Sequence, residues 1–84
     1  MGKREKLLEK ARNSQAGWGR QDIDSLYRAW GFEAQARANH TWYRHPSHSD
    51  LYAAVTRSSG DISRKYVEMA IELIELIEEL IARG

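Results

Sequence analysis

Residues 38–45 read Ala-Asn-His-Thr-Trp-Tyr-Arg-His, and we expect the fold to be built around this segment as the middle strand of a small sheet. Successive side chains of a strand point to opposite sides. One face of this strand therefore carries His40, Trp42 and Arg44, and the other carries Thr41, Tyr43 and His45. The first face combines an imidazole, a flat ring and a guanidinium, which together suit contacts to a base and a phosphate.

The segments on both sides of this strand repeat the two-residue alternation. Residues 32–37 alternate apolar side chains with charged or amide side chains, which predicts a half-buried first strand. Pro46 has no amide hydrogen for a sheet ladder, so it ends the middle strand and begins a polar loop over residues 47–50. Residues 51–57 alternate again and predict a third strand. Three short strands with short connections predict an antiparallel meander.

Helical spacing occurs before and after the strands. Residues 3–13 are strong helix formers, and residues 20–30 carry apolar side chains three and four positions apart. Gly31 is expected to end the second helix. Ser63 is the expected N-cap of a last helix over residues 64–82. The final turns of that helix are apolar, and we expect them to be covered either by the N-terminal helix or by a partner or second copy.

These elements predict a small α+β domain in the order helix, helix, three strands, helix. A chain of 84 residues can build one modest core, so residues 1–84 are expected to form a single domain. Residues 20–82 form its core and residues 1–16 an additional N-terminal helix. A three-stranded antiparallel sheet with helices packed on one face is the layout of double-stranded-RNA-binding-like folds.

Composition and charge narrow the classes of function. The chain has no cysteine, so it can form neither a disulfide nor a thiolate metal site, and we expect no metal and no other cofactor. Its apolar runs are too short for a membrane span or a signal peptide, and we expect a cytoplasmic protein. Residues 37–65 carry five basic and two acidic side chains, whereas residues 66–84 carry one and five. This asymmetry favours an anionic ligand at the middle of the chain and a basic partner at its end.

The sequence resembles the HicA family of toxin–antitoxin ribonucleases over most of its length. The likeness rests on short motifs, which are Gly31-Phe32, His40 followed by Trp42-Tyr43, His45-Pro46, Val55 and Tyr66-Val67. Residues 6–13 are also similar to a leader helix found in part of the family. The family has Gly-Ser before its histidine, where this chain has Ala38-Asn39.

This resemblance implies an enzyme that cleaves mRNA without a metal. It also implies a HicB-like antitoxin as a protein partner that buries the active face. His40 occupies the position of the family's histidine, so the resemblance assigns the catalytic role to His40.

The chemistry of RNA cleavage agrees with a histidine in that role. A base must take the proton from a 2′-hydroxyl and an acid must protonate the departing 5′-oxygen, and histidine suits either task near neutral pH. Arginines stabilise the charge that develops on the phosphate, and an aromatic ring can stack on an unpaired base. The expected RNA-binding residues are Arg37, Asn39, Trp42, Arg44, Arg57, Arg64 and Lys65.

Two other functions fit the same sequence. A non-catalytic module would hold RNA by shape and phosphate contacts, and an interaction protein would pair its acidic C-terminal helix with another chain or with itself. Strand histidines and arginines are often ordinary surface residues, and His45 and His48, which flank the predicted turn, are expected at the surface. Of Trp42 and Tyr43, one must face the core because consecutive strand residues point to opposite sides.

Overall fold

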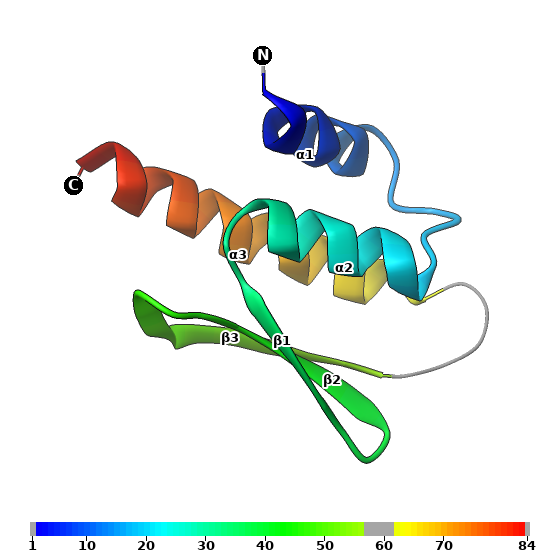
Figure 1. Ribbon diagram of the computed structural model, residues 1–84. Helices are drawn as coiled ribbons and strands as arrows, with labels where there is room; N and C mark the ends of the chain where they lie inside the picture. The colour runs from blue at the N-terminus through cyan, green and yellow to red at the C-terminus, as the bar shows by residue number, and fades with distance from the viewer. Residues whose placement is uncertain (1, 57–61, 84) are drawn as a thin grey trace.

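The computed structural model describes residues 2–56 and 62–83. These residues form α1 (Lys3–Asn13), α2 (Arg20–Ala29), β1 (Glu33–Arg37), β2 (His40–His45), β3 (His48–Thr56) and α3 (Arg64–Arg83). The strands make one antiparallel sheet in the order β1-β2-β3, and the helices lie on one side of it (Figure 1). The predicted α+β fold and its order of elements are confirmed.

The helices are stacked in two layers above the sheet. α2 contacts β1 and α3 contacts β3, whereas α1 packs across α2 and α3 on the side away from the sheet (Figure 1). The indole nitrogen of Trp30 donates to the carbonyl oxygen of Arg4 at 3.1 Å and joins α2 to α1. Arg12 donates to the carboxylate of Glu75 at 2.9 Å and joins α1 to α3. The middle helices are therefore packed on two sides and the sheet on only one.

One apolar cluster fills the space between the layers. Its buried members are Leu8, Ala11, Trp18, Ile23, Leu26, Tyr27, Trp30, Phe32, Tyr43, Ala53, Val55, Ile62, Val67, Ala70, Ile74 and Ile77. In the strands the buried residues alternate with more exposed neighbours, as strand parity requires. The predicted apolar spacing of α2 is confirmed. In α3 the buried residues lie three and four positions apart, and they are Val67, Ala70, Ile74 and Ile77.

The apolar side chains in the last turns of α3 are only partly covered. Leu76, Leu80 and Ile81 keep 46%, 36% and 48% of their surface exposed, while Ile74 and Ile77 are fully buried. The N-terminal helix thus covers part of the apolar surface of α3. Coverage of the remainder by a partner or a second copy stays a prediction.

Local signals at the ends of the helices act as expected. Gly31 has a φ of +89°, the left-handed conformation in which a glycine ends a helix without steric cost. Ser63 caps α3, because its Oγ accepts a hydrogen bond from the amide of Lys65 at 3.3 Å. α2 and β1 are each one residue shorter than predicted, so that Trp30 and Phe32 lie between the two elements.

The third strand begins earlier than its sequence pattern predicts. β3 starts at His48 rather than Leu51, so residues 48–50 belong to the strand and the predicted polar loop is wrong there. The pairing of β2 with β3 is irregular between Arg44 and His45, where His45 pairs with His48. With this irregularity β3 stays paired with β2 at its first residues, although residues 48–50 are polar and do not alternate with apolar ones. Arg57 and the predicted turn over residues 58–61 lie outside the described residues.

The middle strand begins at His40 rather than Ala38, because residues 38 and 39 form the turn between β1 and β2. Arg37 pairs with His40, which leaves a two-residue connection. Ala38 takes a φ of +47°, a conformation in which the Cβ of an L-residue crowds the following carbonyl oxygen. The chain therefore has an alanine where the turn geometry favours glycine.

We expect Ala38→Gly to raise the free energy of unfolding by up to about 1 kcal/mol. Relief of the positive φ is worth about 1–2 kcal/mol, and the greater freedom of glycine in the unfolded chain offsets part of it. Urea denaturation measures the change. Ala36→Gly in β1 is the matched control and should lower stability, because a regular strand has no need of glycine. A loss of stability in Ala38→Gly would contradict the turn described here.

Tyr27 and Tyr43 stack in the core with 4.4 Å between their ring centroids. The hydroxyl of Tyr43 donates to Asp24 at 2.9 Å, whereas the buried hydroxyl of Tyr27 has no partner among the described residues. Burial raises the pKa of both hydroxyls, so both are neutral near pH 7.

Removal of the two hydroxyls should therefore have different effects on the free energy of unfolding. We expect Tyr43→Phe to lower the free energy of unfolding by about 1 kcal/mol, because the hydrogen bond from Tyr43 to Asp24 is lost. Tyr27→Phe should leave stability unchanged or raise it, since no hydrogen bond is lost and a buried polar group is removed. Chemical denaturation of the two variants side by side checks this. A clear loss in Tyr27→Phe would show that its hydroxyl is hydrogen-bonded in solution.

Candidate nucleic-acid interface

The face of the sheet away from the helices is free of helical cover (Figure 1). We name it the open face, and its side chains are Glu33, Gln35 and Arg37 of β1, His40, Trp42 and Arg44 of β2, and Tyr52, Ala54 and Thr56 of β3. The predicted parity of the middle strand is correct, since Trp42 is 38% exposed and Tyr43 only 1%. The open face contributes no residue to the buried cluster.

The strand register arranges the open face in three rows that cross the sheet. The first row is Arg37, His40 and Thr56, the second is Gln35, Trp42 and Ala54, and the third is Glu33, Arg44 and Tyr52. Neighbours within a row have Cβ atoms about 5 Å apart. Successive rows are about 7 Å apart along the strands. A ligand that lies along β2 can therefore contact all three rows.

The first row holds the predicted catalytic histidine. The side chain of His40 is exposed and has no hydrogen-bond or charged partner among the described residues. Its direct neighbour Arg37 is also exposed and is in no ion pair with any residue that the structure describes. Asn39 lies beside them in the turn. An imidazole and a guanidinium are thus adjacent and open to a ligand.

The first turn of α3 lies close to this row. The hydroxyls of Thr56 and Tyr66 are 2.6 Å apart, which joins the end of β3 to the start of the helix. Arg64 and Lys65 are exposed in that turn, and Arg64 lies 3.9 Å from the carboxylate of Glu68. The predicted basic residues of α3 are therefore on the same end of the sheet as His40, and Arg57 lies outside the described residues.

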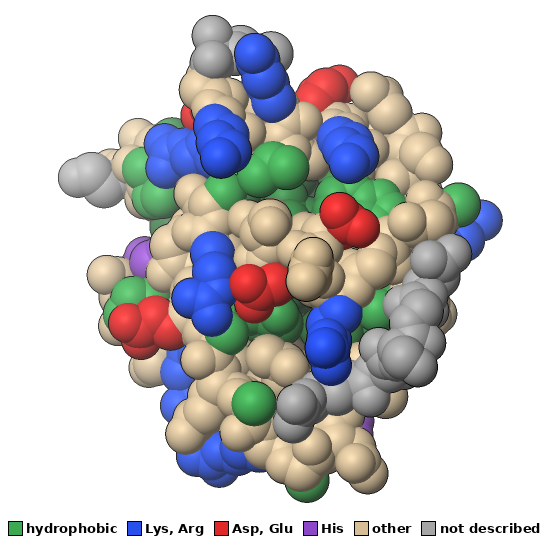
Figure 2. All heavy atoms as spheres, turned by 45° about the vertical axis from the view of Figure 1, so that its right-hand side comes forward, with side chains coloured by type: hydrophobic (Ala, Val, Ile, Leu, Met, Phe, Trp, Pro, Cys, Tyr) green, Lys and Arg blue, Asp and Glu red, His purple; other side chains and the backbone are tan. Residues whose placement is uncertain are grey.

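The second and third rows together hold two aromatic rings and Arg44. The rings of Trp42 and Tyr52 are 6.0 Å apart between centroids, and the guanidinium carbon of Arg44 lies 5.4 Å from the centre of the Tyr52 ring. A groove of about 990 Å³ runs along this end and reaches around β1 to Arg28 and Phe32. In the space-filling view, Lys and Arg side chains lie at the lower left edge of the molecule, where the sheet lies, and also over its middle and upper part (Figure 2).

Tyr52 and Arg28 are parts of this surface that the sequence prediction missed. Strand parity places Tyr52 with Ala54 and Thr56, so pairing of the third strand with the second could have put Tyr52 beside Arg44. No sequence signal places Arg28 there, because it comes from the last turn of α2 and reaches the groove only through the packing of α2 on β1.

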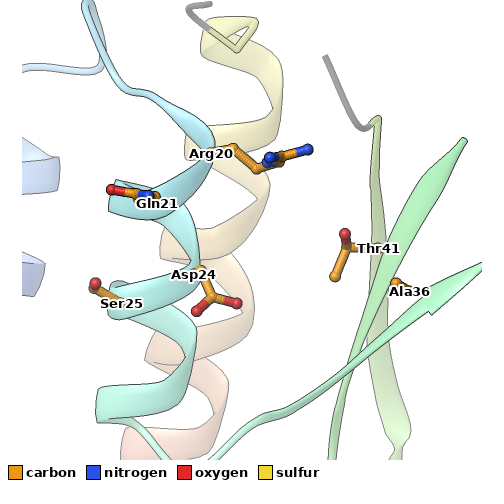
Figure 3. A pocket seen from close by; sticks show the side chains of 6 residues that line it. All are labelled: Arg20, Gln21, Asp24, Ser25, Ala36 and Thr41. Carbon is orange, nitrogen blue, oxygen red and sulfur yellow. The ribbon is translucent and has the colours of Figure 1, made fainter. Parts of the chain in front are cut away.

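A second pocket of about 380 Å³ lies on the helix side of the sheet (Figure 3). Arg20 points across it from α2 toward Thr41, and Asp24 points toward the sheet (Figure 3). Asp24 already accepts hydrogen bonds from Arg28 and Tyr43. This pocket is on the opposite side of the sheet from the open face and contains none of the predicted RNA-binding residues.

His45 and His48 lie at the other end of the sheet from His40. The ring of His45 is 5.3 Å from that of Phe32 and 5.3 Å from that of His48, and its Nδ1 accepts a hydrogen bond from the amide of Ser47 at 3.2 Å. Both histidines are half-buried rather than fully at the surface as predicted. Residues 2–56 and 62–83 contain no group of three or more His, Asp or Glu placed to hold a metal ion.

We expect acid to destabilise the protein through His45. Burial, and to a lesser extent the charge of His48, lower its pKa below the ordinary value of 6.5. At a pH between the folded and the unfolded pKa of His45, the unfolded chain binds more protons than the folded one. The contribution of His45 to the free energy of unfolding is therefore complete above pH 6.5 and is lost as the pH falls below it. Thermal unfolding between about pH 8 and about pH 5.5 measures this, and His45→Gln should flatten the decline. An unchanged decline would contradict the assignment.

The fold and the open face together define the class of this protein, a small α+β domain that presents a basic and aromatic sheet surface. No family model, no curated protein and no solved structure matches the chain. Among residues 2–56 and 62–83, no helix is both long and apolar enough to cross a membrane.

Proposed function

We propose that this protein is a cytoplasmic, HicA-like ribonuclease that binds RNA on its open face and cleaves it through His40 without a metal. The observation that carries the proposal is the position of His40, exposed beside Arg37 and on the same face as Trp42 and Arg44. These side chains belong to no part of the core. Their chemistry is therefore available to a ligand.

The side chains of the first row, His40 and Arg37, carry out the cleavage. His40 takes the proton from a 2′-hydroxyl, and the 2′-oxygen attacks the adjacent phosphorus. The bond from phosphorus to the 5′-oxygen breaks, and that oxygen takes up a proton from the imidazolium or from water. The products are a 2′,3′-cyclic phosphate and a 5′-hydroxyl. Arg37 is paired with His40 across the ladder, with Cβ atoms about 5 Å apart, and it stabilises the negative charge that develops on the phosphate.

A protein that covers the open face would block both binding and cleavage. A HicB-like antitoxin is the partner that the family resemblance implies, and the uncovered sheet is the surface that suits it. Regulation then requires no change in the fold of the ribonuclease.

The proposal is tested by incubating the purified protein with single-stranded RNA in EDTA. We expect cleavage, fragments with cyclic phosphate ends, and loss of both with His40→Ala. Cleavage that requires an added metal, or no cleavage by the pure wild-type protein, would contradict the mechanism.

A non-catalytic RNA-binding module is the second candidate. The second and third rows favour it, since stacking on Trp42 and Tyr52 does not involve His40. Its RNA affinity should fall steeply with added salt and stay unchanged in His40→Ala. Self-association through the exposed leucines of α3 is a third candidate, which predicts a mass in solution that rises with protein concentration and no affinity for RNA.

A further inference from the structure

We propose that the open face selects unpaired RNA, because Trp42 and Tyr52 form a stacking platform for successive bases that leads toward His40. This inference rests on the proposed ribonuclease function and specifies its substrate. It concerns the second and third rows, which the cleavage reaction does not require.

Both rings of the platform are exposed to solvent. Trp42 and Tyr52 keep 38% and 50% of their surface in solvent, whereas the other two tryptophans, Trp18 and Trp30, are each 3% exposed. The exposed rings are 6.0 Å apart with an angle of 33° between their planes, so they form one aromatic surface across β2 and β3. Exposed aromatic rings on a sheet are the usual platforms on which unpaired bases stack.

Arginine side chains lie beside the rings. The guanidinium of Arg44 lies over Tyr52, and neither Arg44 nor Arg37 is in an ion pair with any of the described residues. The acidic side chain of this face is Glu33, opposite Arg44 on β1. Two unpaired guanidiniums beside two rings suit a ligand that has both flat bases and negative phosphates.

The surface around the rings is hollowed into a groove. The groove of about 990 Å³ includes Trp42, Arg44 and Tyr52, which is room for more than one base. Along β2, His40 lies about 7 Å from Trp42 on one side, and Arg44 of the third row lies about 7 Å from Trp42 on the other side. A single strand stacked on the rings can therefore continue along β2 to the imidazole.

A duplex cannot use these features. In an A-form helix the faces of the bases are stacked on each other, and the protein meets mainly phosphates and 2′-hydroxyls. A duplex would contact the arginines and leave Trp42 and Tyr52 without a role. The exposure of both rings therefore favours unpaired RNA.

The test uses a fluorescently labelled 2′-O-methyl oligouridine as single strand and the same oligomer in a duplex. The methyl group removes the 2′-hydroxyl, so binding is measured without cleavage. We expect the single strand to bind at least about 10-fold more tightly at equal salt. Because Trp42 is the exposed tryptophan, binding should also quench the tryptophan fluorescence of the protein.

Variants identify the platform. Trp42→Ala and Tyr52→Ala should each weaken single-strand binding by about 5- to 150-fold, the range expected for one stacked base, and Tyr52→Leu, which keeps apolar bulk, should not restore it. Leu76→Ala, an exposed apolar residue on α3, is the matched control and should bind as the wild type does.

The outcomes separate the two proposals. Equal affinity for the duplex, or unchanged binding in both ring variants, would overturn the platform while leaving cleavage through His40 possible. Selective single-strand binding without cleavage of ordinary RNA would support the platform and overturn the ribonuclease.

Discussion

Replacing His40 by alanine is expected to slow RNA cleavage by about 100- to 10,000-fold, the usual contribution of a positioned acid or base. The exposed side chain of His40 has no partner among the described residues, so the fold should stay intact and the free energy of unfolding should change by less than about 0.5 kcal/mol. Cleavage rates and thermal unfolding of the same preparation measure both quantities.

His48→Ala is the matched control for this variant. It also removes one histidine from the sheet, but His48 pairs with His45 at the end of the ladder remote from His40. We expect its cleavage rate to equal that of the wild type. An equal loss of activity in both variants would show that the effect is not specific to the first row.

Replacing Ile77 by alanine is expected to lower the free energy of unfolding by about 2–5 kcal/mol, because the side chain is fully buried between helices and its loss leaves a cavity. A domain of this size has a total free energy of unfolding of roughly 4–13 kcal/mol, so the variant should be close to unfolding. Urea denaturation followed by circular dichroism measures the change.

Ile81 supplies the comparison, because it has the same side chain one turn further along α3 and is 48% exposed. We expect Ile81→Ala to cost less than about 1 kcal/mol. A large cost that depends on protein concentration would show that a second copy covers this end of the helix. That result would support the self-association that the exposed apolar side chains of α3 predict.

The sequence predicted most of the fold because its local signals agree with one another. Gly31 and Ser63 mark the ends of helices, and the alternation in β2 predicts that Trp42 and Tyr43 lie on opposite faces, one of them in the core. Such features depend on neighbours within a few residues, which a pattern in the sequence contains.

The errors arise where contacts between distant parts of the chain determine the structure. The start of β3 at His48 depends on its pairing with His45 across an irregular ladder, and its polar residues carry no strand pattern. Arg28 reaches the groove because α2 packs on β1, and Tyr52 meets Arg44 because β3 pairs with β2 in one register. Ala38 has an ordinary side chain for a strand, and only the turn that it occupies shows its positive φ.

The position of α1 has a consequence for how this protein can change over evolutionary time. Because α1 covers the helices rather than the sheet, the core is completed entirely on one side of β1, β2 and β3. Substitutions on the other side meet few folding constraints, so related chains can exchange their surface rings and arginines and acquire a new ligand specificity. Folding and specificity can then vary almost independently in a chain of only 84 residues.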